Sequence, residues 1–237
     1  MNVLVIDIGG RNAKVWRSGE AESIKIPSGK SFTPDRLLAG LERELGDWPV
    51  DRVSIGYPGE VEFGRPVKDP YNLGPGWADF DWDEGLGRPV KIMNDACMQA
   101  LGSYEGGRML FLGLGTSIGT TLVSDGQIIP LALGHLLFLG DMSFEDAVSR
   151  RALKVHGVKR WRKYVLHVAS LLRSAFLVDY IVLGGGNAKR LTELPDYCRM
   201  GGNHLAYVGG VRMWEEIASE TADGAALRRP DAVLSVG

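Results

Sequence analysis

Residues 91–121 contain two short apolar segments, and each runs directly into a polar turn. The first segment ends in Asn94-Asp95, and the second ends in the sequence GLGTSIGT at residues 113–120. A carboxylate at a strand end can accept a proton from an alcohol. A turn of glycines and hydroxyl residues lets backbone N–H groups approach phosphate oxygens. Together the two turns predict a site for phosphoryl transfer to an alcohol.

Composition excludes several classes of protein. The chain has 237 residues, 45% of them apolar, which is enough for a sizeable core or two modest lobes. Its net charge of -2 gives no electrostatic footprint for nucleic acid or an anionic membrane. No apolar run approaches the roughly 20 residues that span a bilayer.

Two further features concern the cellular compartment. Cys97 and Cys198 are far apart and form neither a disulfide framework nor a zinc site, so we expect two buried thiols in a reducing compartment. The N-terminal sequence MNVLVIDIGG lacks the charged leader and cleavage site of a signal peptide, and it predicts a strand entering a turn. We therefore expect a cytoplasmic protein.

Apolar runs, turn residues and helical periodicity predict the elements of the chain. Strands are expected at residues 3–6, 12–17, 23–26, 52–55, 89–93, 109–112, 120–123 and 180–183. Helices are expected at residues 34–46, 96–104, 144–153 and 161–177, with a last one beginning near Gly209-Gly210. The stretch 60–87, rich in Gly, Pro and Asp, predicts a long loop, and the tail from about residue 218 is expected to be mobile.

The order of these elements predicts two α/β lobes, at residues 1–106 and 107–237. Sites in such folds lie at the carboxyl ends of strands, in the crevice between lobes. Five predicted strands end in a polar residue or a glycine, at Asp7, Gly56, Asn94-Asp95, Gly113 and Gly184. We expect these strand ends to converge on one site.

Eight motifs, in order along the chain, resemble those of the ROK (repressor, open reading frame, kinase) family of sugar kinases. They are D-I-G-G-x-x-x-K at 7–14, G-Y-P-G at 56–59, N-L-G-x-G-W at 72–77, N-D-A at 94–96, G-L-G-T-S-I-G at 113–119, D-G at 125–126, L-G-H at 133–135 and L-G-G-G at 183–186. Because no cysteine-rich zinc segment follows His135, the chain is most similar to the polyphosphate glucokinase branch.

The resemblance implies an α/β, two-lobed ribonuclease H-like fold of the actin/hexokinase type, which closes on a sugar and a phosphoryl donor, ATP or polyphosphate. It also implies Asp95 as the general base for the sugar 6-hydroxyl. The implied sugar-binding residues are Asn72, Asn94, Asp95 and His135. The implied phosphate- or nucleotide-binding residues are Asp7, Gly9, Gly10, Asn12, Lys14, Gly113, Gly115, Thr116, Gly184, Gly185 and Gly186. Asp7 would hold Mg²⁺ through water, and a homodimer is a further implication.

Several of these residues also fit ordinary structural roles. Asp95 could be the N-cap of the helix that follows it, and Lys14 could face outward from a strand. The glycines of residues 113–119 could serve a hairpin that needs positive φ. His135 could be a buried core histidine, and the tryptophans are expected to pack in the interior rather than to bind sugar.

A basic cluster in the second half of the chain also has two interpretations. It comprises Arg150-Arg151 and the sequence KRWRK at residues 159–163. These side chains could form a solvated helix face, or they could form a track for an anionic chain such as polyphosphate.

Three positions depart from the family pattern. Ala132 stands where the family has a Glu that accepts hydrogen bonds from sugar hydroxyls, and Leu137 stands at a second acidic position. Loss of one charge-assisted hydrogen bond costs about 1.5–3 kcal/mol. Arg11 is bulkier than the usual Ser or Thr.

The departures leave two hypotheses open, a sugar kinase that acts on an unspecified hexose and a non-catalytic sugar or nucleotide sensor of the same fold. A DNA-binding repressor is not favoured, because the chain begins directly at the first strand.

Overall fold

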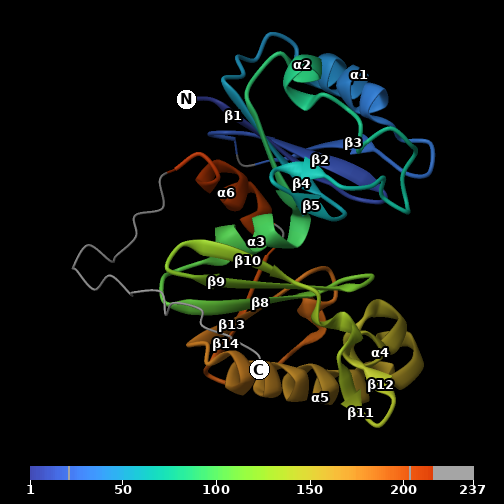
Figure 1. Cartoon of the computed structure of the whole chain (residues 1–237), viewed down its shortest axis with the longest axis vertical. Helices are drawn as coiled ribbons and strands as arrows, with labels where there is room; N and C mark the ends of the chain where they lie inside the picture. Colours follow the sequence, from blue (N-terminus) through green and yellow to red (C-terminus); the bar gives the residue numbers. More distant parts are fainter. Residues whose placement is uncertain (21, 203, 216–237) are drawn as a thin grey trace, which may run out of the picture.

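The computed structural model describes residues 1–20, 22–202 and 204–215. Two five-stranded sheets form two lobes, one above the other in Figure 1, with two helices between them. The tail that was expected to be mobile, from about residue 218, lies outside the described residues. The predicted α/β, two-lobed architecture is confirmed.

The first sheet has the strand order β3-β2-β1-β4-β7. Its strands are β1 (Val3–Ile8), β2 (Asn12–Arg17), β3 (Ile24–Pro27), β4 (Arg52–Tyr57) and β7 (Val90–Asn94). Strands β1, β2 and β3 form an antiparallel meander, whereas β1, β4 and β7 run parallel. Helix α1 (Pro34–Leu45) covers this sheet through buried Leu37 and Leu41, and it begins with Pro at its first turn as predicted.

The second sheet has the order β10-β9-β8-β13-β14. Its strands are β8 (Arg108–Leu114), β9 (Ile118–Ser124), β10 (Gln127–Leu131), β13 (Tyr180–Gly184) and β14 (Cys198–Met200). The predicted hairpin at residues 109–123 is confirmed, because β8 and β9 pair antiparallel. A small hairpin of β11 (Leu137–Leu139) and β12 (Met142–Ser143) and the short helices η1 (Leu133–His135) and η2 (Ala188–Arg190) complete this lobe.

The helices of the second lobe have different bounds from those expected. Helix α4 (Phe144–Val148) stops early, and α5 (Arg150–Phe176) begins at once, because Ser149 caps the new helix by accepting a hydrogen bond from the Ala152 amide. Gly157 interrupts α5 with a φ of 73°. Buried Trp161 and Val165 then pack α5 against the sheet.

Helices α3 (Asp95–Ser103) and α6 (Leu205–Arg212) lie between the two sheets (Figure 1). Their backbones touch, because a side chain at Gly102 would overlap the Leu205 carbonyl and one at Gly209 would overlap the Met98 carbonyl. The expectation that the last helix begins near Gly209-Gly210 is therefore wrong. It begins at Leu205, and these glycines lie inside it where the two helices need the space.

The expected loop at residues 60–87 contains short elements. These are the hairpin of β5 (Val61–Glu62) and β6 (Arg65–Pro66) and helix α2 (Trp82–Leu86), whose N-cap Asp81 accepts a hydrogen bond from the Glu84 amide. Trp77 and Trp82 are buried in the core of the first lobe, with ring centroids 5.8 Å apart. As expected, these tryptophans serve packing. Within the described part of the chain, no helix combines the length and apolarity needed to cross a membrane.

Candidate active site

Three parallel strands of the first sheet bring Asp7 and Asp95 to the same edge. Asp7 of β1 is in register with Gly56 of β4, and Tyr57 of β4 is in register with Asn94 of β7. Asp95 follows Asn94 directly as the first residue of α3. Gly56 lets α3 approach the sheet, because a side chain there would overlap Met98 and lie 3.5 Å from the Asp95 Cα.

The N-cap of α3 is Asn94, so the cap role considered for Asp95 belongs to its neighbour. The Asn94 side-chain oxygen accepts hydrogen bonds from the amides of Ala96 at 2.9 Å and Cys97 at 3.4 Å, and its Nδ2 donates to the Gly59 carbonyl. A sugar hydroxyl that contacts Asn94 would have to share the side-chain oxygen or nitrogen of Asn94 with these backbone groups. Asp95 Oδ1 accepts from the Ala96 amide at 2.8 Å. Its other oxygen has no hydrogen-bond partner within residues 1–20, 22–202 and 204–215.

Burial raises the pKa of Asp95 to about 7, and the nearby charge of Asp7 raises this pKa as well. Burial also raises the pKa of Asp7, against the effect of Lys14, whose Nζ lies 3.5 Å from Asp7 Oδ2. A carboxyl with a pKa near 7 suits a general base at neutral pH. Because Lys14 forms this ion pair with Asp7, its side chain points toward the Asp7 carboxylate and not only into solvent.

A cleft of about 580 Å³ opens in front of Asp7. It collects seven of the residues singled out in the sequence, namely Asp7, Gly9, Gly10, Asn12, Lys14, Asn72 and Thr116. The cleft also includes Gly29 and three basic residues that were not assigned to the site, Arg11, Lys30 and Arg150. Because Thr116 and Arg150 belong to the second lobe, both lobes contribute to this cleft.

The glycine turn between β8 and β9 is tied to the β13 turn. The Asn187 amide donates to the Leu114 carbonyl at 3.0 Å, and Asn187 Nδ2 donates to the Gly115 carbonyl at 3.2 Å. Gly185 has a φ of 79° and backs onto Leu114, while a side chain at Gly184 would overlap the Phe111 ring. The two glycine turns are thus neighbours, as predicted, and part of their glycine content serves packing.

His135 is exposed, at the end of η1, so the interpretation as a buried core histidine is wrong. Its neighbour Gly134 lies against Glu145, because a Cβ at Gly134 would be 3.4 Å from Glu145 Oε2. This carboxylate also accepts a hydrogen bond from the Ile118 amide at 2.9 Å. Sequence reasoning missed Glu145, since an acidic residue in the first turn of a helix looks like an ordinary helix-dipole partner.

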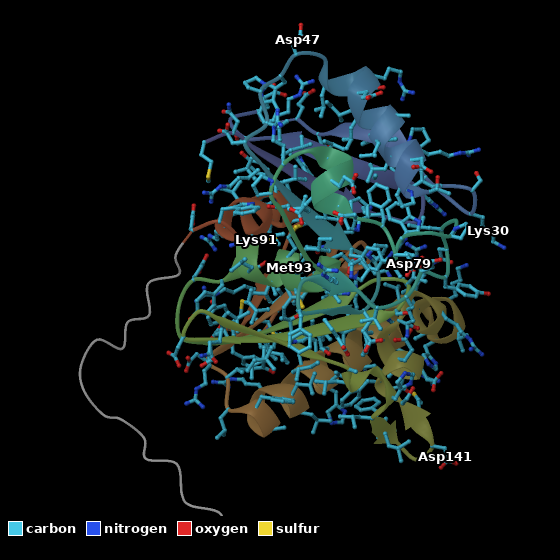
Figure 2. The ribbon with its side chains drawn as sticks, turned by 45° about the horizontal axis from the view of Figure 1, so that its top comes forward. Lys30, Asp47, Asp79, Lys91, Met93 and Asp141 are labelled. Atoms are coloured by element: carbon cyan, nitrogen blue, oxygen red, sulfur yellow. The ribbon has the colours of Figure 1, made fainter. Side chains whose placement is uncertain are left out.

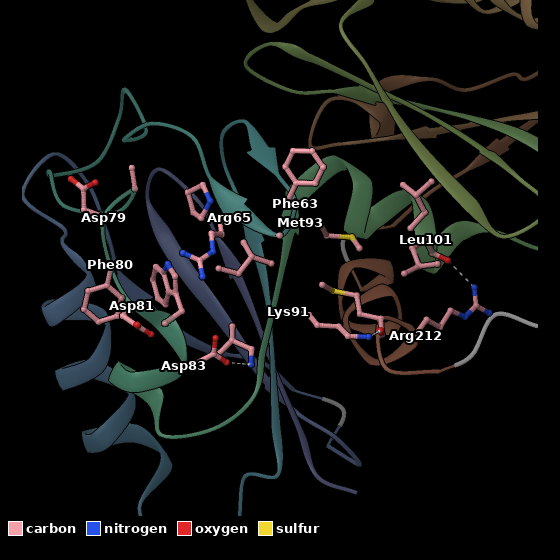
Figure 3. Close-up of a pocket in the computed structure, with 18 of the residues that line it drawn as sticks. Phe63, Arg65, Asp79, Phe80, Asp81, Asp83, Lys91, Met93, Leu101 and Arg212 are labelled. Carbon is pink, nitrogen blue, oxygen red and sulfur yellow. Dashed lines mark hydrogen bonds between the residues drawn. The ribbon is translucent and has the colours of Figure 1, made fainter.

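A second and larger cavity, of about 850 Å³, lies along strand β7 (Figure 3). Its lining includes Phe63, Phe80 and Met93, and none of the predicted site residues. Two of its cations are already held by backbone oxygens, since Lys91 donates to the Met213 carbonyl and Arg212 to the Leu101 carbonyl. The candidate active site is therefore the smaller cleft.

The curated relatives of the chain include polyphosphate glucokinases and an N-acetylmannosamine kinase. No family model matches the chain. The polyphosphate glucokinase of Mycobacterium tuberculosis is 28% identical over 152 residues, which cover 58% of this chain and 57% of the relative. The chain thus matches little more than half the length of this relative.

Solved structures show the same fold. The inorganic polyphosphate/ATP-glucomannokinase from Arthrobacter sp. has a TM-score of 0.71 at 24% identity, covering 90% of this chain and 97% of that one. The ROK hexokinase from Thermus thermophilus has a TM-score of 0.68 at 24% identity, covering 89% and 96%. The chain has the fold of the ROK sugar kinases, and its sequence is related to the polyphosphate glucokinases.

Proposed function

We propose that the chain is a sugar kinase that transfers a phosphoryl group from ATP or polyphosphate to the 6-hydroxyl of a hexose. The observation that carries this proposal is the position and pKa of Asp95. Asp95 follows a strand end and its pKa is raised to about 7, in part by the charge of Asp7. Asp7 lines the cleft, whereas Asp95 is not among the lining residues. Named relatives that are polyphosphate glucokinases support the same activity.

In this mechanism Asp95 accepts the proton of the sugar hydroxyl as the oxygen attacks the donor phosphorus. Lys14 and the amides of the two glycine turns stabilise the charge on the transferred phosphoryl group. Thr116 reaches the same cleft from the second lobe and offers its hydroxyl to a phosphate oxygen. Closure of the lobes would exclude water from the reacting atoms.

The residues present fit Mg²⁺ as a lightly held ion. The charge of Asp7 raises the pKa of Asp95, and Lys14 is the cation that lowers the pKa of both carboxyls. No cluster of three or more His, Cys, Asp or Glu side chains that could hold a metal occurs within the described ranges. Mg²⁺ uses one or two carboxylates together with water and phosphates, and Asp7 would hold it through water. When bound, Mg²⁺ neutralises negative charge on the donor phosphates.

The sugar is assigned here only as a hexose. Ala132 is exposed and offers no acceptor, but Glu145 places a carboxylate beside the Gly134-His135 turn. We propose that His135 and Glu145 take part in sugar recognition, together with Asn72. We also propose that the protein works in the cytoplasm and that a homodimer is its assembly.

The test is a coupled assay with glucose, mannose and N-acetylmannosamine, each with ATP and with polyphosphate. The Asp95→Asn variant removes the general base while it preserves size, so we expect turnover to fall by about 10²- to 10⁴-fold. Circular dichroism of the variant controls for folding. Equal turnover by the wild type and this variant would contradict the proposal.

The second candidate is a non-catalytic sensor of the same fold. It is favoured by one observation, the Ala132 and Leu137 positions, where the family pattern has acidic residues. Calorimetric binding of a hexose without turnover with either donor would support the sensor, and turnover with any hexose would exclude it.

A further inference from the structure

We propose that Arg11, Lys30 and Arg150 are donor-specificity residues, which hold phosphate groups beyond the one transferred and so favour a bare phosphate chain over a nucleotide. This inference rests on the proposed function, because it concerns the donor side of the same site. All three side chains line the cleft in front of Asp7, and all three are exposed to solvent there.

Two of the three cations come from neighbouring loops of the first lobe. Ser28 joins these loops, because its amide donates to the Arg11 carbonyl at 2.9 Å and its hydroxyl donates to the Gly9 carbonyl at 2.5 Å. Lys30 follows two residues later, and Figure 2 shows it on the outer edge of the first lobe. The loop that carries Lys30 is therefore held by hydrogen bonds to the turn that contains Gly9, Gly10 and Arg11.

The third cation comes from the second lobe. Arg150 is the first residue of α5, and its amide donates to the Gly115 carbonyl at 3.0 Å. Asn187 donates to the same carbonyl, so the backbone of Arg150 is anchored to the glycine turn that carries Thr116. A phosphate chain in the cleft would then meet cations from both lobes.

No acidic side chain in the described part of the chain forms an ion pair with these three residues. Among the described residues, none of the three has a carboxylate within 4.0 Å, and none donates a side-chain hydrogen bond. The cleft lining holds four basic side chains and one carboxylate, Asp7, which is already paired with Lys14. In a chain whose net charge is -2, this concentration of unpaired positive charge selects a polyanion.

The lining also lacks what a nucleoside needs. Its eleven residues are glycines, polar residues and charged residues, with no apolar or aromatic side chain among them. Small-molecule pockets that bind a ring are lined mainly by hydrophobic and aromatic groups. Phosphates can bind along this surface, whereas an adenine ring would find no face to pack against.

The experiment compares donors in Arg11→Ala, Lys30→Ala and Arg150→Ala, with long-chain polyphosphate, tripolyphosphate and ATP as probes. For long-chain polyphosphate we expect kcat/KM to fall by about 3- to 10-fold in each variant, as for loss of a solvent-exposed charge contact, and less for ATP. The dependence of the polyphosphate KM on salt should also weaken in each variant.

Arg150→Lys keeps the charge and should retain most of the polyphosphate activity. Lys68→Ala, an exposed cation outside the cleft, is the matched control and should behave as the wild type.

Equal losses for ATP and polyphosphate, or losses no greater than in Lys68→Ala, would overturn the inference. A larger loss in Lys163→Ala than in the cleft variants would also overturn it, because the polyanion would then follow the α5 surface. If the wild type turns over no donor, calorimetric titration with tripolyphosphate separates the two proposals. Binding that weakens in Arg11→Ala and Arg150→Ala keeps the inference while the kinase proposal fails, and absence of binding to the wild type refutes the inference itself.

Discussion

At the scale of single residues, two roles are considered for the Asn94-Asp95 motif, the N-cap of α3 and the proposed general base. The structure gives the N-cap role to Asn94. Asn94 caps α3 and holds Gly59, so Asp95 keeps one carboxylate oxygen that no other described residue uses. A carboxylate saturated by amide donors has a lowered pKa and is a poor base. Because burial and Asp7 dominate instead, the pKa of Asp95 rises to about 7. The cap by Asn94 thus leaves one oxygen of Asp95 available for the proposed role as a base.

The raised pKa predicts how stability changes with pH in the metal-free protein. A carboxyl whose pKa is higher in the folded state binds more protons when folded, so stability falls as pH rises from about 4 to about 7 and then levels off. Asp95→Asn removes this penalty. We expect the variant to be the more stable protein at pH 8 and to lose part of the pH dependence. Urea unfolding at pH 5 and pH 8, with Asp79→Asn as an exposed control, measures this, and identical pH dependence in both proteins would contradict it.

At the scale of elements, helix α6 is fixed to the first lobe by close backbone contacts and by a buried hydrogen-bond chain. Trp214 Nε1 donates to Ser54 Oγ at 2.8 Å, and Ser54 Oγ donates to the Gly210 carbonyl at 2.5 Å. These bonds join α6 to β4 across more than 150 positions of sequence. Gly209 lies at the point where α6 meets α3.

Gly209→Ala should therefore destabilise the protein, although alanine has a higher helix propensity than glycine. The added methyl group would overlap the Met98 carbonyl, and such overpacking costs typically about 1–3 kcal/mol. For a chain of this size we expect a melting temperature lower by about 2–4 °C for each kcal/mol. Gly186→Ala, where nothing lies within 4 Å of the added Cβ, is the control. An unchanged or higher melting temperature in Gly209→Ala would show that the helices can separate without cost.

At the scale of the whole molecule, residues of both lobes line the cleft in front of Asp7, so a ligand that binds in this cleft should stabilise the two lobes against each other. A hexose or tripolyphosphate that binds only the folded protein raises its free energy of unfolding by about 2.7 kcal/mol at a ligand concentration of 100 times Kd, and so raises its melting temperature. We expect the shift with both ligands together to exceed the sum of the separate shifts in the presence of Mg²⁺. Differential scanning fluorimetry measures this, and strictly additive shifts would argue against closure of the lobes on both ligands.

The sequence was sufficient for much of this fold and for part of the site. Strand runs such as residues 12–17 and the turn at residues 113–119 have local signals, namely apolar patterning and glycines at strand ends. The start of α6 has no such signal, because Gly209 and Gly210 resemble helix breakers until the backbone of α3 is in place. Lys30 and Arg150 are remote in sequence, and only tertiary packing brings them to one cleft. Tertiary packing likewise brings Glu145 to the Ile118 amide.

The return of α6 to the first lobe has a consequence for synthesis of the chain. Residues on β1 and β2 that α6 covers, among them Val3, Val5 and Trp16, share one cluster with Ala206 and Met213. While a ribosome is still adding residues 104–204, this cluster has Met98 and Leu101 of α3 but lacks the cover of α6, and an exposed apolar face invites wrong association. The first lobe is therefore completed only after the second lobe has been made, because α6 follows the second lobe in the sequence.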